Sequence, residues 1–197
     1  RFGRTGQNKV WLAGNNLMRG LLTDDEALVA EARDQIAGEI VVTDGEGIQA
    51  DGSFHQHGPQ IQFGNYGLAY AEGISFWLRV LDGTPYMFSD EQCAVIENLM
   101  REGICRSIWR GVMDPSFCGR QVFIDSGPGK ALSAAVAAEN IAALKRPGHR
   151  VFKRFAEGIL TPDNRSDGLR GPCYYDRSDC GIYRTGTWYA SIRMHSD

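Results

Sequence analysis

The sequence has no run of 18 apolar residues, so it predicts no membrane-spanning helix. Proline is also scarce, with 7 among 197 residues, while 43% of the residues are hydrophobic, which excludes a disordered chain. A net charge of −3 argues against a basic nucleic-acid-binding protein. Lysine is rare: four of the 21 basic residues are lysine and the rest arginine, whose planar fork suits carboxylates and sulfates.

The five cysteines are odd in number and form no CxxC pair, so we expect neither a zinc site nor a complete disulfide framework. Cys173 and Cys180 would close a small loop in an oxidising compartment, and buried free thiols are the alternative. The chain opens on Arg1-Phe2-Gly3-Arg4 without a secretion signal. We therefore expect any leader to lie outside this sequence.

Apolar residues recur at helical spacing in six segments, which predicts a mainly α-helical fold. Capping-box patterns begin two of these segments, at Thr23 to Glu26 and at Ser89 to Gln92. Successive helical hairpins with polar connections favour an α/α layered or toroidal array whose loops gather at one end. The predicted helices span 8–22, 24–36, 66–81, 90–104, 130–144 and 151–160.

The connections and the tail differ in character from the helices. Residues 39–43 form a short extended piece, and residues 44–64 and 111–129 form long polar loops, which in compact domains are usually functional or disordered. Residues 187–194 alternate with period two, which predicts a strand with one apolar face. We therefore assign residues 1–170 to a helical domain and residues 171–197 to a linker and the first strand of a β domain. The residues on the predicted apolar face are Trp188, Ala190, Ile192 and Met194.

The richest chemistry lies in the first long loop, in DGSFHQHG at 51–58, followed by Asn65-Tyr66-Gly67. A histidine and a tyrosine supply two proton-transfer groups, and Arg120 from the second loop beside Tyr66 would favour the phenolate. His55 and His57 would point the same way on an extended segment and offer a metal site. No carboxylate or cysteine companion is evident, so we expect no metal and no cofactor.

These segments resemble a known family. DGSFHQHG followed by GNYG resembles the DGSF-x-QH…YG segment of polysaccharide lyase family 8. Three further stretches agree in order with that family: TGQN at 5–8, Gly119-Arg120, and the stretch from Tyr174-Tyr175-Asp176-Arg177 through Trp188 to Met194-His195-Ser196. The resemblance implies the second half of an α/α toroid that runs into an antiparallel β-sandwich. It also implies that the rest of both domains lies outside this sequence.

Carried over by position, the resemblance implies a catalytic set of Asn8, His57, Tyr66 and Arg120. Asn8 and His57 would stabilise the negative charge that develops on a uronate carboxylate, and Arg120 would hold Tyr66 and contact the anionic chain. Tyr66 would take the C5 proton and return a proton to the leaving oxygen; alternatively, His57 is the base and Tyr66 only the acid. The expected substrate contacts are Trp11, His55, Gln56 and Asn65.

Two positions depart from the family pattern. Lys9-Val10 stand where relatives commonly carry a pair of tryptophans, which leaves Trp11 alone. Ile124 stands four residues after Arg120, where a second arginine is common. Both changes affect positions that would contact the glycan.

We therefore expect a lyase that cleaves an acidic, uronic-acid-containing polysaccharide such as hyaluronan or chondroitin by β-elimination. The alternatives are an α/α-toroid glycoside hydrolase with Asp51 and Asp114 as its carboxylate pair, or a non-catalytic glycan-binding module. Because such polymers occur outside the cytoplasm, we expect a secreted or periplasmic protein. We expect no nucleic-acid partner and no membrane insertion.

Overall fold

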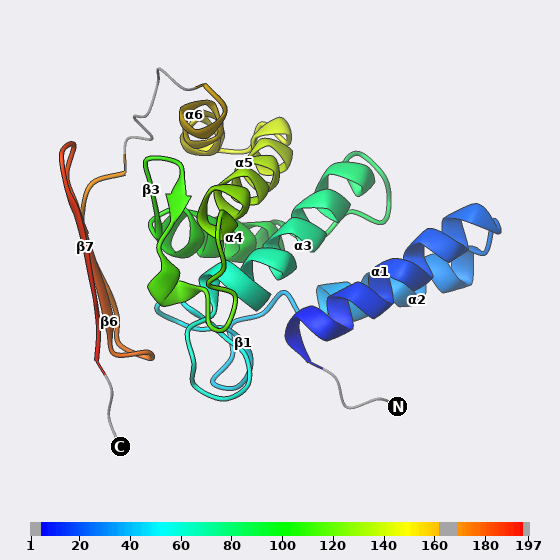
Figure 1. Ribbon diagram of the computed structural model, residues 1–197. Helices are drawn as coiled ribbons and strands as arrows, with labels where there is room; N and C mark the ends of the chain where they lie inside the picture. The colour runs from blue at the N-terminus through cyan, green and yellow to red at the C-terminus, as the bar shows by residue number, and fades with distance from the viewer. Residues whose placement is uncertain (1–4, 162–168, 195–197) are drawn as a thin grey trace.

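The computed structural model describes residues 5–161 and 169–194 (Figure 1). These residues form a mainly helical body with a small antiparallel sheet along one side, which confirms the predicted fold class. None of the described helices is long and apolar enough to cross a membrane. The α-helices are α1 (Gly6–Leu22), α2 (Glu26–Ala37), α3 (Leu68–Leu81), α4 (Asp90–Asn98), α5 (Ser126–Ala143) and α6 (His149–Leu160).

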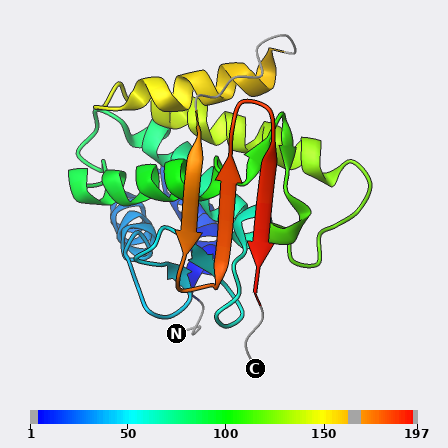
Figure 2. The ribbon, with the colours of Figure 1, turned by 90° about the vertical axis from the view of Figure 1, so that its left-hand side faces the viewer.

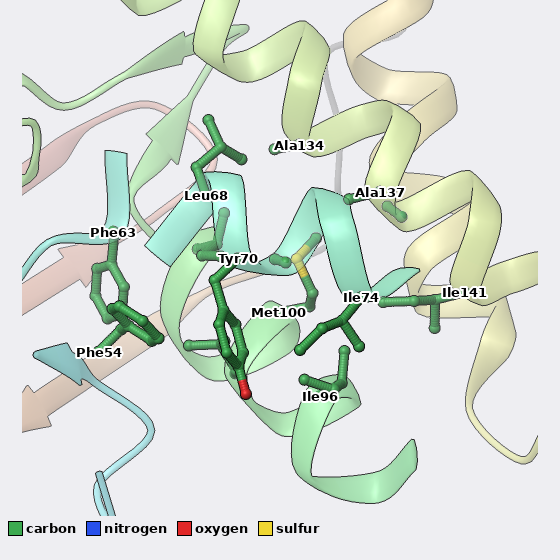
Figure 3. Packing of buried hydrophobic residues seen from close by; sticks show 14 of the residues in the cluster. Phe54, Phe63, Leu68, Tyr70, Ile74, Ile96, Met100, Ala134, Ala137 and Ile141 are labelled. Atoms are coloured by element: carbon green, nitrogen blue, oxygen red, sulfur yellow. The ribbon is translucent and has the colours of Figure 1, made fainter. Parts of the chain in front are cut away.

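Helix α3 lies at the centre of the helical body. It packs against α1 on one side and α5 on the other, while α1 pairs with α2 and α5 pairs with α6 (Figure 1). Ile74 and Tyr70 of α3 are fully buried, and Figure 3 shows Ile74 between Ile96 and the alanine-rich face of α5. Small side chains on α5, such as Ala134 and Ala137, let the two helices approach closely.

The helix starts differ in part from the sequence prediction. The capping box at Ser89 is confirmed, since its side chain accepts from the Gln92 amide and the Gln92 side chain bonds back. The capping box at Thr23 is wrong: Asp25 caps α2 by accepting from the Leu28 amide at 3.0 Å. Thr23 instead follows the end of α1, where its backbone N–H donates to the Arg19 carbonyl.

Two predicted α-helices contain π-helical turns. The segment expected to start at Tyr66 begins as a π-helix over Phe63–Gly67 (η1) before α3, and α4 continues as a second π-helix over Leu99–Ile104 (η2). Such wider turns occur frequently at functional sites. Helix α5 also begins earlier than expected, at Ser126, because its first turn tolerates a proline that lacks an amide donor.

The connections contain more structure than their polar composition predicts. The first long loop folds into the hairpin of β1 (Gly47–Ile48) and β2 (Phe54–His55). The stretch 105–129 holds the hairpin of β3 (Ile108–Trp109) and β4 (Val112–Met113) and the 3-10 turn Pro115–Phe117. The predicted extended piece at 39–43 contributes one bridge, between Val42 and Ile48.

The C-terminal part corrects the prediction of a linker followed by one strand. It forms a three-stranded antiparallel sheet of β5 (Gly171–Tyr175), β6 (Cys180–Arg184) and β7 (Tyr189–Arg193), in that order (Figure 2). Strand β7 confirms the predicted tail strand. The two preceding strands escaped detection because glycine, proline and an inward arginine interrupt their apolar alternation. The last residues of the quoted family stretch, His195-Ser196, lie outside the described residues.

The inner face of the C-terminal sheet is hydrogen-bonded to residues 102–106 of the helical body. Arg184 is 1% exposed and donates to the backbone carbonyls of Cys105 at 2.8 Å and Arg106 at 3.2 Å. Tyr175 is fully buried, and its hydroxyl donates to the Glu102 carbonyl. The apolar face predicted for the tail points outward, with Ile192 67% exposed. All five cysteines lie within the described residues, and none of them forms a disulfide.

Removal of the Ile74 side chain tests the central position of α3. We expect Ile74→Ala to lower the free energy of unfolding by about 2 to 5 kcal/mol, because a fully buried branched side chain leaves a cavity. Leu132→Ala is the control: this α5 side chain is 49% exposed, and its loss should cost less than ~1 kcal/mol. Urea unfolding measures both, and equal effects would contradict this packing.

Candidate active site

Five of the eight predicted site residues line one open pocket of about 540 Å³. They come from three separate parts of the chain: Asn8 and Trp11 from α1, Asn65 and Tyr66 from the π-helix before α3, and Arg120 from the second loop. The first turns of α5 complete the wall. The other lining residues are Leu68, Ala69, Glu72, Gln121, Phe123, Asp125, Ser126, Gly129, Lys130 and Ser133.

Glu39 fixes the start of α1 and thereby Asn8. Its carboxylate accepts from the Gly6 amide at 2.6 Å and from the Lys9 ammonium at 2.7 Å. A helix N-terminus leaves amide donors without partners and carries partial positive charge, so a carboxylate there is favourable. Lys9, one of the two departures from the family pattern, therefore serves to anchor the helix.

Glu46 holds the histidine loop against the same helix end. Its carboxylate accepts from the Thr5 hydroxyl at 2.7 Å, the Gln56 side-chain amide at 2.7 Å and the His57 backbone amide at 2.8 Å. The hydrogen bond from Thr5, with further contributions from His57, lowers the pKa of Glu46 despite partial burial. One carboxylate thus joins two segments of the site.

His57 lies against Tyr66. Their ring centroids are 4.8 Å apart and the rings meet edge to face at 77°. His57 is exposed and adopts a left-handed φ of 60°, while Tyr66 is half-buried on the π-helix. Glycines permit this π-helix: a Cβ on Gly67 would lie 2.9 Å from the Gln62 carbonyl oxygen, and one on Gly64 only 2.6 Å from Cys118 Sγ.

Arg120 reaches the pocket from a tight backbone turn. Gly119 before it has φ +55°, and a Cβ there would lie 2.8 Å from the Gln62 side-chain oxygen, so the position favours glycine. The Arg120 side chain is exposed and forms no ion pair with any described carboxylate. Ile124 is 90% exposed and does not line the pocket, whereas Phe123, 66% exposed, does.

His55 and Gln56, predicted to contact substrate, do not line the pocket. His55 is 4% exposed, and its Nε2 lies 2.8 Å from the Ser178 hydroxyl. Burial, assisted by Arg177 and opposed by Asp51, lowers the pKa of His55. Gln56 is 2% exposed and bonds Glu46. Both side chains therefore support the loop rather than face the pocket.

The two histidines also do not form the metal pair that an extended segment would give. Strand β2 ends at His55, and the left-handed backbone at His57 turns the second ring away from the strand. Within residues 5–161 and 169–194, no group of three His, Cys, Asp or Glu side chains is placed to hold a metal ion.

The carboxylates of the hydrolase alternative serve other contacts. Asp51 accepts from the Ser53 amide and hydroxyl and from the Arg177 backbone amide at 2.8 Å. Asp114 caps the 3-10 turn through the Ser116 amide and accepts from the Tyr189 hydroxyl at 2.7 Å. Burial and Asp114 together raise the pKa of Tyr189. Neither carboxylate lines the pocket.

Sequence reasoning missed several residues of the site. Ser126, Gly129, Lys130 and Ser133 line the pocket with the i, i+3, i+4, i+7 spacing of one helix face, a signal that was present in the sequence. Glu72 falls on the same face of α3 as Leu68, which also lines the pocket. No sequence signal marks Glu46, because its role depends on segments that meet only in the fold.

The pocket therefore combines an amide, a phenol in contact with an imidazole, a guanidinium and two exposed aromatic rings. An amide can hydrogen-bond a carboxylate, and a phenol beside an imidazole can move protons. Exposed rings such as those of Trp11 and Phe123 offer flat apolar surfaces for sugar rings.

Solved structures define the fold class. The chain superposes on a Paenibacillus xanthan lyase with a TM-score of 0.83 at 20% identity, covering 91% of this chain and 20% of that one. It superposes on a chondroitinase AC lyase, solved in oligosaccharide complexes, with a TM-score of 0.79 at 22% identity, covering 98% of this chain and 29% of that one. The described helices are thus part of an α/α toroid.

Sequence comparisons give the family. The model of the N-terminal alpha-helical domain of polysaccharide lyase family 8 matches residues 1–161, and the chain belongs to this family. Chondroitinase-AC of Pedobacter heparinus is 35% identical over 120 residues, which cover 60% of this chain and 17% of that protein. Xanthan lyase of Bacillus sp. strain GL1 is 25% identical over 171 residues, 84% of this chain and 18% of that protein. The chain spans less than a fifth of these relatives.

Replacing Glu46 tests whether one carboxylate orders the site. We expect Glu46→Ala to raise the amide hydrogen-exchange rates of residues 5–9 and 56–58, because three donors lose their acceptor, at a cost of about 1 to 3 kcal/mol in local stability. Glu157→Ala, on the exposed face of α6, should leave those rates unchanged. Unaltered exchange in Glu46→Ala would refute the role of Glu46.

The lowered pKa of His55 predicts a pH dependence of stability. Below its ordinary value of 6.5, His55 in the unfolded chain takes up a proton that the folded chain binds less readily. Stability should therefore fall as the pH drops below about 6.5. His55→Gln should flatten this part of the melting-temperature profile, while His149→Gln should not. Identical profiles for His55→Gln and the parent would contradict the prediction.

Proposed function

We propose that the protein is a polysaccharide lyase that cleaves a uronic-acid-containing, hyaluronan- or chondroitin-like polysaccharide by β-elimination. The observation that carries the proposal is the contact between His57 and Tyr66 beside a pocket that Asn8 and Arg120 also line. Membership of the family supports it, as do relatives named chondroitinase-AC, hyaluronate lyase and xanthan lyase. In this proposal residues 1–170 belong to the catalytic toroid domain and residues 171–197 open the β-sandwich domain.

In the proposed reaction, the Asn8 amide and the His57 imidazole hydrogen-bond the uronate carboxylate and stabilise the charge that develops on it. Tyr66 as phenolate takes the C5 proton, and the electron pair of that C–H bond forms the C4–C5 double bond while the bond from C4 to the glycosidic oxygen breaks. Tyr66 then returns the proton to that oxygen. The products are a new hydroxyl end and a 4,5-unsaturated sugar.

A second assignment fits the same geometry. His57 is exposed next to Tyr66, so its imidazole can take the C5 proton while Tyr66 protonates the leaving oxygen. In both assignments Arg120 contacts the anionic chain, and Trp11, Phe123 and Asn65 contact sugar rings and hydroxyls. His55 and Gln56 contribute indirectly, by holding the loop that carries His57.

The hydrolase alternative loses its carboxylate pair, since Asp51 and Asp114 are engaged elsewhere and do not line the pocket. Hydrolysis at this pocket would have to use Glu72 and Asp125 instead. We also propose a secreted or periplasmic location, because large acidic polysaccharides are found outside the cytoplasm.

The test incubates the natural-length protein with each of a panel of uronic-acid polysaccharides and follows the ultraviolet absorbance of the reaction mixture. Elimination creates a conjugated double bond that absorbs, and hydrolysis does not. We expect Tyr66→Phe to lower the rate by about 10² to 10⁴, because it removes a proton-transfer group. Tyr183→Phe, on the exposed outer face of the sheet, should retain the parent rate.

Other outcomes identify the alternatives. Saturated reducing ends without absorbance would indicate hydrolysis. Binding without either product would indicate a glycan-binding module. Full activity in Tyr66→Phe would remove Tyr66 from the mechanism.

A further inference from the structure

The pocket contains a second cation besides Arg120, namely Lys130. It lies on the pocket-facing side of α5 with Ser126, Gly129 and Ser133, opposite the α1 and π-helix walls. Its burial is intermediate. It is one of only four lysines in the sequence.

Lys130 forms no direct ion pair with a carboxylate of the described residues. Its ammonium donates to the Gln121 side-chain oxygen at 2.6 Å, and no described carboxylate lies within ion-pair distance. Burial lowers the pKa of Lys130, and the nearby Cys118 and Glu72 act in the opposite direction. A neutral amide uses one of three ammonium donors, so the partial loss of water around this charge is only partly offset.

Gln121 also orients the ammonium. It lies next to Arg120 in the chain and lines the same pocket, so both cations face the same cavity. The family's second arginine position, by contrast, is filled here by Ile124, which is 90% exposed and outside the pocket. The pocket's second positive charge thus comes from the following helix.

We propose that Lys130, oriented by Gln121, is a specificity-determining contact that binds an anionic group of the polysaccharide, a carboxylate or a sulfate. This inference rests on the proposed function for the identity of the ligand. An arriving anion would supply the charge-assisted hydrogen bonds that the ammonium lacks, and such bonds are stronger than those between neutral groups. Lys130 takes no part in proton transfer.

The experiment measures binding separately from turnover. The natural-length protein carrying Tyr66→Phe is titrated by calorimetry with a hyaluronan tetrasaccharide, which has carboxylates only, and with a chondroitin sulfate tetrasaccharide, which has both anions. We expect Lys130→Met to raise Kd roughly ten- to a hundredfold. Lys130→Arg should restore most of the affinity, and Lys153→Met, an exposed lysine on α6, should leave it unchanged.

Each outcome decides the inference. An equal loss on both tetrasaccharides supports a carboxylate contact, and a loss confined to the sulfated one supports a sulfate contact. Unchanged affinity for both overturns the proposal, as does an absence of binding by the unmodified Lys130 protein.

Steady-state kinetics of Lys130→Met and Lys130→Arg in protein that retains Tyr66 distinguish a substrate contact from a structural role of Lys130. A substrate contact raises KM and leaves kcat largely unchanged, whereas a lower kcat together with a lower melting temperature in both Lys130 variants would mean a structural role and overturn the inference. If no unsaturated product forms while Lys130→Met still weakens binding, the lyase proposal fails and the Lys130 inference stands.

Discussion

The arrangement of the site depends on the carboxylate of Glu46. It accepts hydrogen bonds from the segment just before α1 and from the loop that carries His57, and so joins two parts of the chain that are about 50 residues apart in sequence. Glu39 holds the first turn of the same helix by accepting from the Gly6 amide and the Lys9 ammonium. The proposed reaction requires Asn8 and His57 to face one substrate, and two charged anchors at the N-terminus of α1 set that geometry.

The second constraint is the close packing of neighbouring segments against the π-helix that carries Tyr66. The π-helix that carries it fits only because glycines at 64 and 67 leave room for Cys118 and for the Gln62 carbonyl. Gly119 lies against the side-chain oxygen of Gln62 and turns the chain so that Arg120 reaches the pocket. The phenol and the guanidinium therefore converge through close packing of main chain, whereas the outer wall on α5 is built by an ordinary helical face.

The sequence predicts the helices well and the connections poorly. Periodicity found α1, α3 and α5, and the Ser89 capping box marked the start of α4, because these signals are local. The first two strands of the C-terminal sheet were missed because Gly171 and Pro172 open β5, and because Arg184 of β6 occupies an inward position and bonds to distant carbonyls. The family motifs marked Asn8, Tyr66 and Arg120, which line one pocket, and helical spacing on α5 could have marked Lys130, whereas Glu46 acts through contacts that no local pattern reveals.

The most direct test of the account is a crystal structure of the natural-length protein carrying Tyr66→Phe with a bound uronate oligosaccharide. The account predicts a uronate whose C5 faces position 66 and whose carboxylate lies within hydrogen-bond range of the Asn8 amide. An oligosaccharide bound instead at the separate pocket between Trp109 and Tyr189, with the first pocket empty, would contradict it.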